Sequence, residues 1–284
     1  MKTISELLQW ATQSLPLHDY ALLEAQVLLA YVLHCERSYL YAWPEKEVTQ
    51  PQLEQFEALI VRRQQHEPIA YLIGQKEFWS LSFQVTRDTL IPRFETELLV
   101  QKVLEILLPT PLDILDVGTG CGNIACALAH ERNQWHITAT DVSAAAIAVA
   151  KRNAKNLNLN DITFLQSEWL SALPDKYFDA IISNPPYIRQ NDVHLIHGDL
   201  LYEPQIALTP GIKGLEAFEI LIAQAAQHLK PNGLLALEHG FDQAEAVSSL
   251  LQQSAFHNIQ TFQDLAGLSR VTVGYFCNDS GAVS

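Results

Sequence analysis

The sequence predicts an α/β protein with a mostly parallel sheet, preceded by a small helical domain. Three observations support this: helical apolar spacing in roughly the first 70 residues, alternating strand and helix patterns after about residue 95, and glycines where a strand passes into a helix. With 284 residues and 48% hydrophobic content, the chain can bury a substantial core. We expect a helical domain over 1–75, a hairpin linker over 76–92, the α/β domain over 93–277 and a flexible tail over 278–284.

The N-terminal domain is expected to be helical. An apolar stripe at spacings of three and four residues runs through residues 22–33. A second stripe begins at Leu53 after Pro51, which suits the first turn of a helix. Pro68 and Gly74 interrupt this pattern, so the helical region should end near them.

The main domain shows short strands alternating with helices. Before it, residues 76–88 alternate apolar and polar side chains and predict a hairpin. Strands joined by helices run parallel, so their carboxyl ends meet at one edge of the sheet. The last strand can instead pair antiparallel at one edge of the sheet. The expected strands are 112–118, 135–141, 162–167, 178–184, 233–240 and 269–276, and the expected helices are 123–130, 144–157 and 214–229.

The charge narrows the classes of function. The net charge is −14, from 18 basic and 32 acidic residues, so the surface repels phosphate backbones on average. The densest basic spots, Arg62-Arg63 and Lys151-Arg152, are short and lie in expected helices, which favours solvated helix faces. We therefore expect no direct nucleic-acid partner.

Cysteine and histidine spacing argues against a metal site. The four cysteines form no CxxC pair and the ten histidines show no HExxH-like spacing. Glu6 stands where a secretion signal would become apolar, and no apolar run approaches the roughly 18–20 residues that cross a bilayer. We expect a cytoplasmic protein with free thiols, no bound metal and no membrane partner, and we expect it to be a monomer.

A glycine-rich turn follows the first strand of the main domain, in the run "DVGTGCG" over residues 116–122. Glycines allow a tight turn close to a ligand, and the next helix directs its N-terminus there. The run from Gly120 to Ala125 also satisfies the dinucleotide pattern GxGxxA, so a nucleotide-type site is expected at this place. Asp116 favours S-adenosylmethionine, because a carboxylate there repels a pyrophosphate but suits an ammonium group.

A second acid, Asp141, closes the next strand. A carboxylate at this position can accept hydrogen bonds from both hydroxyls of a ribose. The alternative is structural: Asp141 would then cap the helix that the chain enters through Ser143.

The strand over 178–184 ends abruptly in Asn184-Pro185-Pro186-Tyr187. Adjacent prolines cannot donate to a sheet, and a turn needs one proline at most, which indicates a chemical role. A planar amino group is a poor nucleophile because its lone pair is delocalised. The Asn184 side-chain oxygen and the Pro185 carbonyl can each accept one of its N–H groups, while Tyr187 offers the amide a flat face. We predict catalytic roles for Asn184, Pro185 and Tyr187, and substrate contacts for these residues and Pro186.

Nearly the whole chain resembles the HemK/PrmC family, the bacterial protein-(glutamine-N5) methyltransferases of class-1 peptide chain release factors. The resemblance implies a class I S-adenosylmethionine-dependent methyltransferase domain with a Rossmann-like sheet. One segment departs from it, because the family more often has Pro-Arg-Pro-Asp-Thr-Glu at 92–97, which leaves the roles of Phe94 and Glu95 open. We expect this segment to border the active-site crevice. The matching stretches are "EPIAYLIGQKEFWSL" (67–81), "LIPRFETE" (90–97), "ILDVGTGCGNIA" (114–125), "ISNPPYI" (182–188), "LLALEHG" (234–240) and "RVTVGYF" (270–276).

The resemblance also implies an activity and residue roles. The expected reaction methylates the glutamine side-chain amide in the Gly-Gly-Gln tip of a release factor, with S-adenosyl-L-homocysteine as the second product. Trp169 is expected to stack on adenine, and the N-terminal helices to dock the protein substrate, unless they only stabilise the fold. The implied cofactor-binding residues are Gly118, Thr119, Gly120, Cys121, Gly122, Asp141, Trp169 and Asn184.

Two other functions remain compatible with the motifs. An adenine-N6 DNA methyltransferase would use the same clamp, because the exocyclic amine of adenine is also planar, but it needs basic surface and a target-reading module. A non-catalytic cofactor-binding scaffold would not need an intact Asn184-Pro185-Pro186-Tyr187 run.

Overall fold

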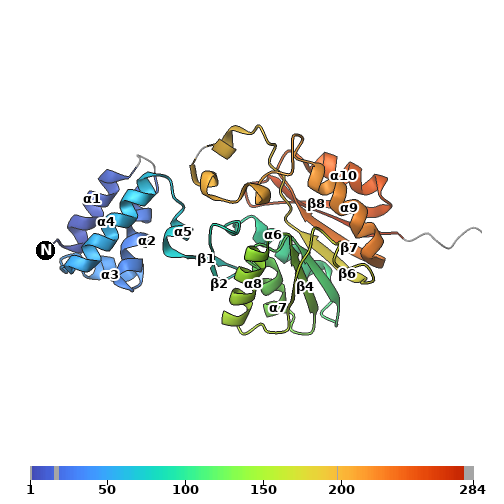
Figure 1. Cartoon of the computed structure of the whole chain (residues 1–284), viewed down its shortest axis with the longest axis horizontal. Helices are drawn as coiled ribbons and strands as arrows, with labels where there is room; N and C mark the ends of the chain where they lie inside the picture. Colours follow the sequence, from blue (N-terminus) through green and yellow to red (C-terminus); the bar gives the residue numbers. More distant parts are fainter. Residues whose placement is uncertain (1, 16–18, 197, 278–284) are drawn as a thin grey trace, which may run out of the picture. The chain divides into compact units, whose positions relative to one another are not determined.

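A computed structural model of the chain describes residues 2–15, 19–196 and 198–277 (Figure 1). The tail expected over 278–284 lies outside the described residues. The described residues form two compact units. The first comprises the chain up to Gln75 together with Ile196–Tyr202, and the second comprises Lys76–Leu195 and the chain from Glu203 onward. The segment expected as a linker, 76–92, thus falls within the second unit.

The first unit packs helices around one apolar core, as the apolar stripes predicted. Thr3 and Thr49 begin two of the helices with reciprocal capping contacts between side chain and backbone. Leu7, Leu28 and Phe56 are fully buried between the helices. The α-helices described in this unit are α1 (Ile4–Ser14), α2 (Ala21–Leu33), α3 (Arg37–Ala42), α4 (Gln50–Gln64) and α5 (Ile69–Ile73).

The segment Ile196–Tyr202 is anchored in the first unit by the half-buried Arg63. The Arg63 guanidinium donates to the Glu24 carboxylate and to Asp199 Oδ1, at 2.7 Å in each case. The Tyr202 hydroxyl donates to the Gln65 carbonyl at 2.7 Å. Arg63 therefore holds two carboxylates of its own unit and does not belong to a solvated basic face, which corrects that expectation.

The second unit is built on a seven-stranded sheet in the order β5-β4-β3-β6-β7-β9-β8. Strands β3 to β7 pair in parallel and β9 pairs antiparallel with both of its neighbours. The bounds are β3 (Asp113–Val117), β4 (His136–Asp141), β5 (Thr163–Gln166), β6 (Phe178–Ser183), β7 (Leu229–Glu238), β8 (Phe256–Gln263) and β9 (Ser269–Phe276).

The edge of the sheet formed by the C-terminal strands differs from the expectation. Strand β9 is antiparallel as expected, but it lies inside the sheet, and the edge strand is β8, which the sequence interpretation missed. In β8 the apolar residues Phe256, Ile259 and Phe262 are three positions apart, which is not the spacing of a strand. The pairing of β8 is interrupted between His257 and Gln260, and Asn258 has φ 49°, so irregular backbone hides the strand pattern.

Helices cover both faces of this sheet (Figure 1). Leu115 of β3 packs in the core that α9 and α10 cover, whereas the next residue, Asp116, bonds to the start of α7 on the other face. Three short 3₁₀ turns lie between β6 and α9: Val193–Ile196, Gly198–Tyr202 and Gln205–Ala207. The helices of this unit are α6 (Thr96–Ile106), α7 (Asn123–Glu131), α8 (Ala144–Asn156), α9 (Glu216–His228) and α10 (Ala244–Gln253).

The predicted hairpin is confirmed as β1 (Gln75–Phe78) and β2 (Leu81–Gln84). The buried Asn153 amide of α8 accepts from the Gln84 N–H at 2.8 Å and donates to the Gln84 carbonyl at 2.9 Å. It also donates to the Cys121 carbonyl at 2.8 Å, so one side chain joins the hairpin to the glycine turn. Among the described residues, no helix has both the length and the apolar character that a membrane crossing requires.

Candidate functional site

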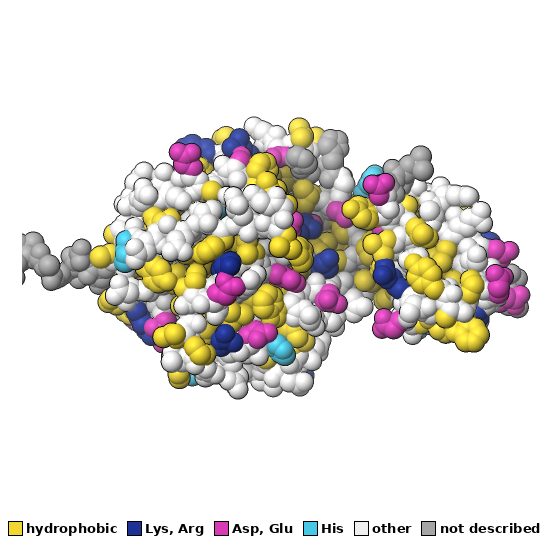
Figure 2. All heavy atoms as spheres, turned by 180° about the vertical axis from the view of Figure 1, so that it is seen from behind, with side chains coloured by type: hydrophobic (Ala, Val, Ile, Leu, Met, Phe, Trp, Pro, Cys, Tyr) yellow, Lys and Arg dark blue, Asp and Glu magenta, His cyan; other side chains and the backbone are white. Residues whose placement is uncertain are grey.

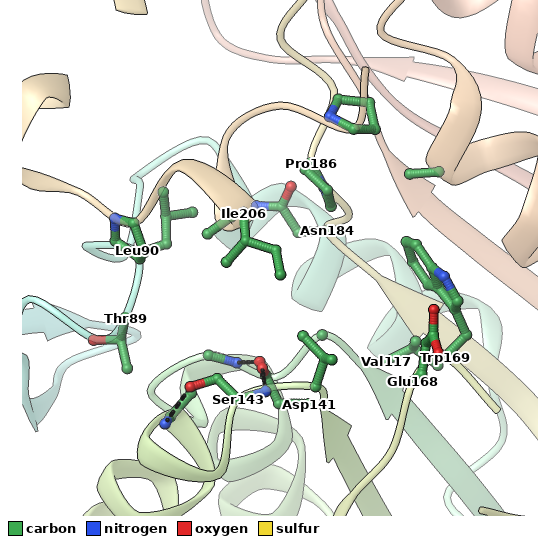
Figure 3. A pocket seen from close by; sticks show the side chains of 18 of the residues that line it. Thr89, Leu90, Val117, Asp141, Ser143, Glu168, Trp169, Asn184, Pro186 and Ile206 are labelled. Carbon is green, nitrogen blue, oxygen red and sulfur yellow. Dashed lines mark hydrogen bonds between the residues drawn. The ribbon is translucent and has the colours of Figure 1, made fainter. Parts of the chain in front are cut away.

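A cavity of about 310 Å³ lies at the carboxyl ends of the parallel strands in the second unit (Figure 3). This volume is at the lower end of the range for small-molecule sites, roughly 300–1,000 Å³. In Figure 3, Asn184 and Pro186 lie across the cavity from Asp141 and Ser143. The predicted site residues that line it are Gly118, Gly120, Asp141, Trp169, Asn184 and Pro186.

The glycine turn presents open backbone to the cavity. Gly118 has φ 74° and Gly120 has φ 56°, a left-handed conformation that glycine adopts without strain. A Cβ atom added to either residue would meet no other atom within 4 Å, so the space above both belongs to the cavity. The N–H groups of Gly118 and Thr119 both donate to the Thr140 carbonyl at 2.8 Å, which ties the turn to the neighbouring strand.

Three other residues of this turn do not line the described cavity: Thr119, Cys121 and Gly122. The Thr119 and Cys121 side chains are buried. Gly122 is the N-cap residue directly before α7, and a Cβ atom there would lie 3.0 Å from the Ala150 side chain, so glycine permits close helix packing. Their predicted contact with a cofactor stays a prediction.

Asp116 lies fully buried beneath the turn. Its Oδ2 accepts from the Thr119 hydroxyl at 2.6 Å and from the Ala125 N–H at 3.2 Å, while Oδ1 has no partner among the described residues. Burial raises the pKa of this carboxyl group to about 7. The argument that placed Asp116 beside an ammonium group is therefore corrected: its side chain supports the turn and does not line the cavity.

Asp141 joins the glycine turn to the helix that follows β4. Its Oδ2 accepts from the Gly120 N–H and its Oδ1 from the Ser143 N–H, both at 2.9 Å, as the dashed lines in Figure 3 show. The helix cap itself is Ser143, whose hydroxyl oxygen accepts from the Ala146 N–H. Burial raises the pKa of Asp141. Each carboxylate oxygen retains acceptor capacity toward the cavity, so Asp141 can bind a ligand's hydroxyl groups.

Trp169 follows β5 and lines a third side of the cavity (Figure 3). Its φ of 53° is left-handed, which is strained for a bulky residue and marks a position that the surrounding structure enforces. The half-buried indole packs against the core between the sheet and α9. It therefore offers a ring of restricted mobility to a planar ligand.

The motif after β6 forms the side of the cavity opposite Asp141. The Ser183 hydroxyl donates to the Val117 carbonyl at 2.7 Å and joins the ends of β6 and β3. The Asn184 Nδ2 group donates to the Thr96 hydroxyl oxygen at 3.1 Å. Pro186 lines the cavity, whereas Pro185 is buried next to it. The amide of Asn184 is thus held from outside the cavity by the first residue of α6.

Tyr187 is braced on two sides. Its hydroxyl donates to Glu238 Oε1 at a long 3.4 Å, and its carbonyl accepts from Gln243 Nε2 at 3.0 Å. A Cβ atom on Gly214 would approach the Tyr187 carbonyl to 2.7 Å, so only glycine fits there. Burial raises the pKa of the Tyr187 hydroxyl. The ring is not part of the described cavity lining, and its contact with an amide plane stays a prediction.

The segment 92–97 supports the site through Thr96, whose hydroxyl oxygen accepts from Asn184 Nδ2. Phe94 is 66% exposed and Glu95 precedes the first turn of α6, so neither lines the described cavity. The buried Glu203 accepts from the Ile91 N–H at 3.0 Å and pairs with Arg93. This pairing connects the segment to the loop that carries the lining residues of 204–210.

Several lining residues were missed from the sequence. Ser167 directly follows β5, and the rule that ligands bind at strand carboxyl ends could have identified it. Thr89 and Leu90 come from an irregular segment and Ile206 from the 3₁₀ turn Gln205–Ala207, and neither segment carries a periodic signal. Within the described ranges, no group of three or more His, Cys, Asp or Glu side chains is placed to hold a metal ion.

Two family models match the chain. The PrmC N-terminal domain covers residues 6–74, and the methyltransferase small domain covers residues 94–265. Among solved structures, a methyltransferase from Pyrococcus furiosus has a TM-score of 0.53 at 19% identity, over 78% of this chain and 98% of that one. A ribosomal protein L11 methylase from Lactobacillus delbrueckii subsp. bulgaricus has a TM-score of 0.51 at 22% identity, over 66% and 81%. These structures show the class I methyltransferase fold.

Curated relatives match over nearly the whole length. A release factor glutamine methyltransferase from Shewanella oneidensis is 45% identical over 272 residues, or 95% of both chains. Proteins of the same name from Coxiella burnetii and Pseudomonas aeruginosa are 46% and 43% identical, over 88% and 96% of this chain and 90% and 99% of theirs. The chain therefore belongs to the family of release factor glutamine methyltransferases.

Proposed function

We propose that the protein transfers a methyl group from S-adenosylmethionine to the side-chain nitrogen (N5) of the glutamine in the Gly-Gly-Gln motif of class-1 peptide chain release factors. One observation carries the proposal: Asn184 lines the same cavity as the open glycine turn and Asp141. An acceptor for a planar amino group and a cradle for a cofactor thus share one space, as a direct transfer between two bound partners requires. Membership of the family supports the same reaction.

The cavity suits a cofactor without phosphate groups. The backbone at Gly118 and Gly120 leaves room for close approach, and no Lys or Arg side chain lines the described cavity. Asp141 would hold the ribose hydroxyls and Trp169 the adenine ring. When bound there, S-adenosylmethionine supplies a methyl group on a positively charged sulfur.

The protein's own part in the reaction is to position the glutamine amide. The Asn184 side-chain oxygen accepts one N–H of the amide and the Pro185 carbonyl accepts the other, which directs the nitrogen at the methyl group. Tyr187 would hold the amide plane. No strong base is needed, because the nitrogen becomes acidic only as its new bond to carbon forms.

The surface charge disfavours a DNA methyltransferase. On the face drawn in Figure 2, Lys and Arg side chains lie scattered among Asp and Glu and do not form a continuous stripe. The Arg62 guanidinium pairs with Glu67 at 2.7 Å, and Arg63 is held by carboxylates of its own unit. A protein substrate fits this surface better than a phosphate backbone does.

We propose a cytoplasmic monomer as the working form.

The N-terminal unit is proposed to dock the release factor. Among its large exposed side chains, Tyr41 at 67% and Trp43 at 59% are two positions apart in the sequence and suit a protein contact. Replacing both with Ser should lower methylation of intact release factor while leaving a short Gly-Gly-Gln peptide as substrate unchanged. An equal loss with both substrates would contradict the docking role.

Mass spectrometry after incubation with the cofactor tests the proposed function. We expect one added methyl group on the Gly-Gly-Gln glutamine of intact release factor, and none on a factor in which that glutamine is replaced by glutamate. Duplex DNA in a parallel sample should gain no methyl group. Methylated DNA with an unmodified factor would favour the adenine-N6 alternative, and no transfer to either would favour the scaffold.

A further inference from the structure

A buried carboxyl group lies next to the residue that would hold the glutamine amide. In the parallel pairing of β6 with β7, Ser183 lies beside Leu237, so the two following residues, Asn184 and Glu238, occupy matching positions. Glu238 is 1% exposed. The Tyr187 hydroxyl donates to its Oε1 at 3.4 Å, and the Thr96 hydroxyl favours its charged form by lowering its pKa. Its Oε2 atom has no partner among the described residues, which is rare for a buried polar atom.

The Thr96 hydroxyl acts on the pKa of this carboxylate and also contacts Asn184. A hydroxyl group has one proton and can accept further hydrogen bonds. When Thr96 donates that proton to the Glu238 carboxylate, its oxygen can only accept from a second partner. It does so from Asn184 Nδ2 at 3.1 Å. The amide of Asn184 must then present its oxygen on the other side, where an amino group of the substrate needs an acceptor.

We propose that Thr96 and Glu238 are positioning residues that orient the Asn184 side chain, so that its oxygen faces the glutamine amide. The proposal rests on the proposed function for the identity of that amide. The order of hydrogen bonds runs from Asn184 to Thr96 and from Thr96 to Glu238. Reversing it would turn the Asn184 amino group toward the substrate's N–H groups, where two donors would oppose each other.

The charge on Glu238 decides which way the hydrogen bonds between Glu238, Thr96 and Asn184 run. Burial, together with the nearby Glu95, raises its pKa to about 7, whereas Arg270, Thr96 and Tyr187 oppose the shift. A protonated carboxyl group can donate to Thr96, which frees the Thr96 proton for the Asn184 oxygen. The amide of Asn184 then turns over. Methyl transfer should therefore decline as the pH falls through this pKa.

Variants of Thr96 test the orientation directly. Thr96→Val keeps the shape but removes the hydroxyl, and we expect kcat to fall about 10- to 100-fold with the affinity for S-adenosylmethionine unchanged. Thr96→Ser restores the hydroxyl and should recover kcat to within about threefold of the parent. As a matched control, Thr138→Val removes the hydroxyl of another buried threonine, in β4 and outside the described cavity lining, and should leave kcat unchanged. Equal rates for the Val and Ser variants of Thr96 would overturn the proposal.

The pH dependence separates positioning from mere packing. At saturating cofactor, which removes any contribution of Asp141 to binding, kcat of the parent should decline on the acid side of about pH 7. Glu238→Gln has no carboxyl group to protonate and should lack this decline, whatever its absolute rate. An identical acid decline in Glu238→Gln would overturn the proposal.

Nuclear magnetic resonance gives a readout that does not depend on the substrate's identity. The side-chain NH₂ signal of Asn184, assigned by its loss in Asn184→Ala, should shift with pH around neutrality in the parent and stay constant in Glu238→Gln. If the parent does not methylate release factor but shows this titration, the proposed function fails and the orienting chain stands. If the Asn184 signal does not change with pH in the parent, the proposed orientation of Asn184 by Thr96 and Glu238 is overturned, while the proposed function is not affected.

Discussion

Gly118 and Gly120 are held by backbone and short side-chain bonds to the next strand, through the Thr140 carbonyl and Asp141. Asn184, across the cavity, is held by Thr96, which lies 88 residues away in the chain. We call these regions the glycine wall (Gly118 and Gly120 with Asp141) and the amide wall (Asn184–Tyr187). The glycine wall is thus built mainly from local turn geometry, and the amide wall from side chains that only folding brings together.

This difference implies that substitutions in the two walls affect different steps, namely cofactor binding and methyl transfer. Changes in the glycine wall should weaken cofactor binding, because that wall presents backbone and a carboxylate to the ligand. Changes behind the amide wall should lower the rate of transfer with cofactor binding intact, because they move or rotate the acceptor. The following experiments test whether the two walls are as separate as their supports suggest.

The largest effect is expected at the amide wall itself. Asn184→Ala removes the side-chain acceptor for the glutamine N–H, and kcat should fall about a thousandfold, as for the loss of a positioned hydrogen-bonding group in other active sites. Isothermal titration should show that cofactor binding persists. A variant that turns over at the parent rate would refute the clamp, and complete loss of cofactor binding would refute the separation of the walls.

A smaller effect is expected at the glycine wall. Asp141→Asn leaves one oxygen in place of two acceptors, so the Gly120 and Ser143 N–H groups cannot both be satisfied. We expect the affinity for S-adenosylmethionine to fall about 10- to 100-fold. Asp113→Asn, at the opposite end of the neighbouring strand and paired with Lys230, is the matched control and should not change the affinity. Equal losses in both variants would point to a general loss of stability.

Replacing Gln243, which supports the amide wall from behind, should lower kcat moderately. Gln243→Leu removes two donated hydrogen bonds, to the carbonyls of Tyr187 and Gly214. We expect kcat to fall about tenfold with little change in cofactor affinity, because the Tyr187 backbone loses its support. Gln252→Leu, an exposed position in α10, serves as control. If cofactor affinity falls more than kcat, the brace does not act on the amide wall.

The last prediction concerns stability and compares a buried carboxyl group behind each wall. Burial raises the pKa of both Asp116 and Glu238 to about 7. Between the ordinary carboxyl value near 4 and this value, the folded state binds more protons than the unfolded state. The free energy of unfolding should therefore fall as the pH rises through this window, by up to about 1.4 kcal/mol per pH unit for each group, and level off above it.

Urea unfolding of the parent, Asp116→Asn and Glu238→Gln at several pH values between 5 and 8 measures this slope. Each variant should remove one group's share of the decline. A variant that keeps the full slope of the parent would show that its carboxyl group titrates normally in the folded protein.

The pattern of the chain was sufficient to predict the glycine wall and a mostly parallel sheet. Alternating strands and helices imply a common carboxyl edge, and glycines before α7 imply a turn, because both depend on residues adjacent in sequence. The same holds for the end of β6, since the Asn184 to Tyr187 run cannot continue a strand. Periodicity alone left glutamine and adenine amines both open as substrates, and the proposal of glutamine draws on the family to which the chain belongs.

Folding alone determined which side chains support the amide wall. Thr96, Glu238 and Gln243 come from three separate segments, and nothing in their local pattern indicates that they meet around Asn184 and Tyr187. The inward direction of Asp116 and the edge position of β8 were likewise unpredictable, because burial and irregular pairing depend on neighbours distant in the chain. Local sequence thus specifies turns and strand ends, whereas the orientation of an acceptor depends on which distant hydrogen-bond partners the packed core places beside it.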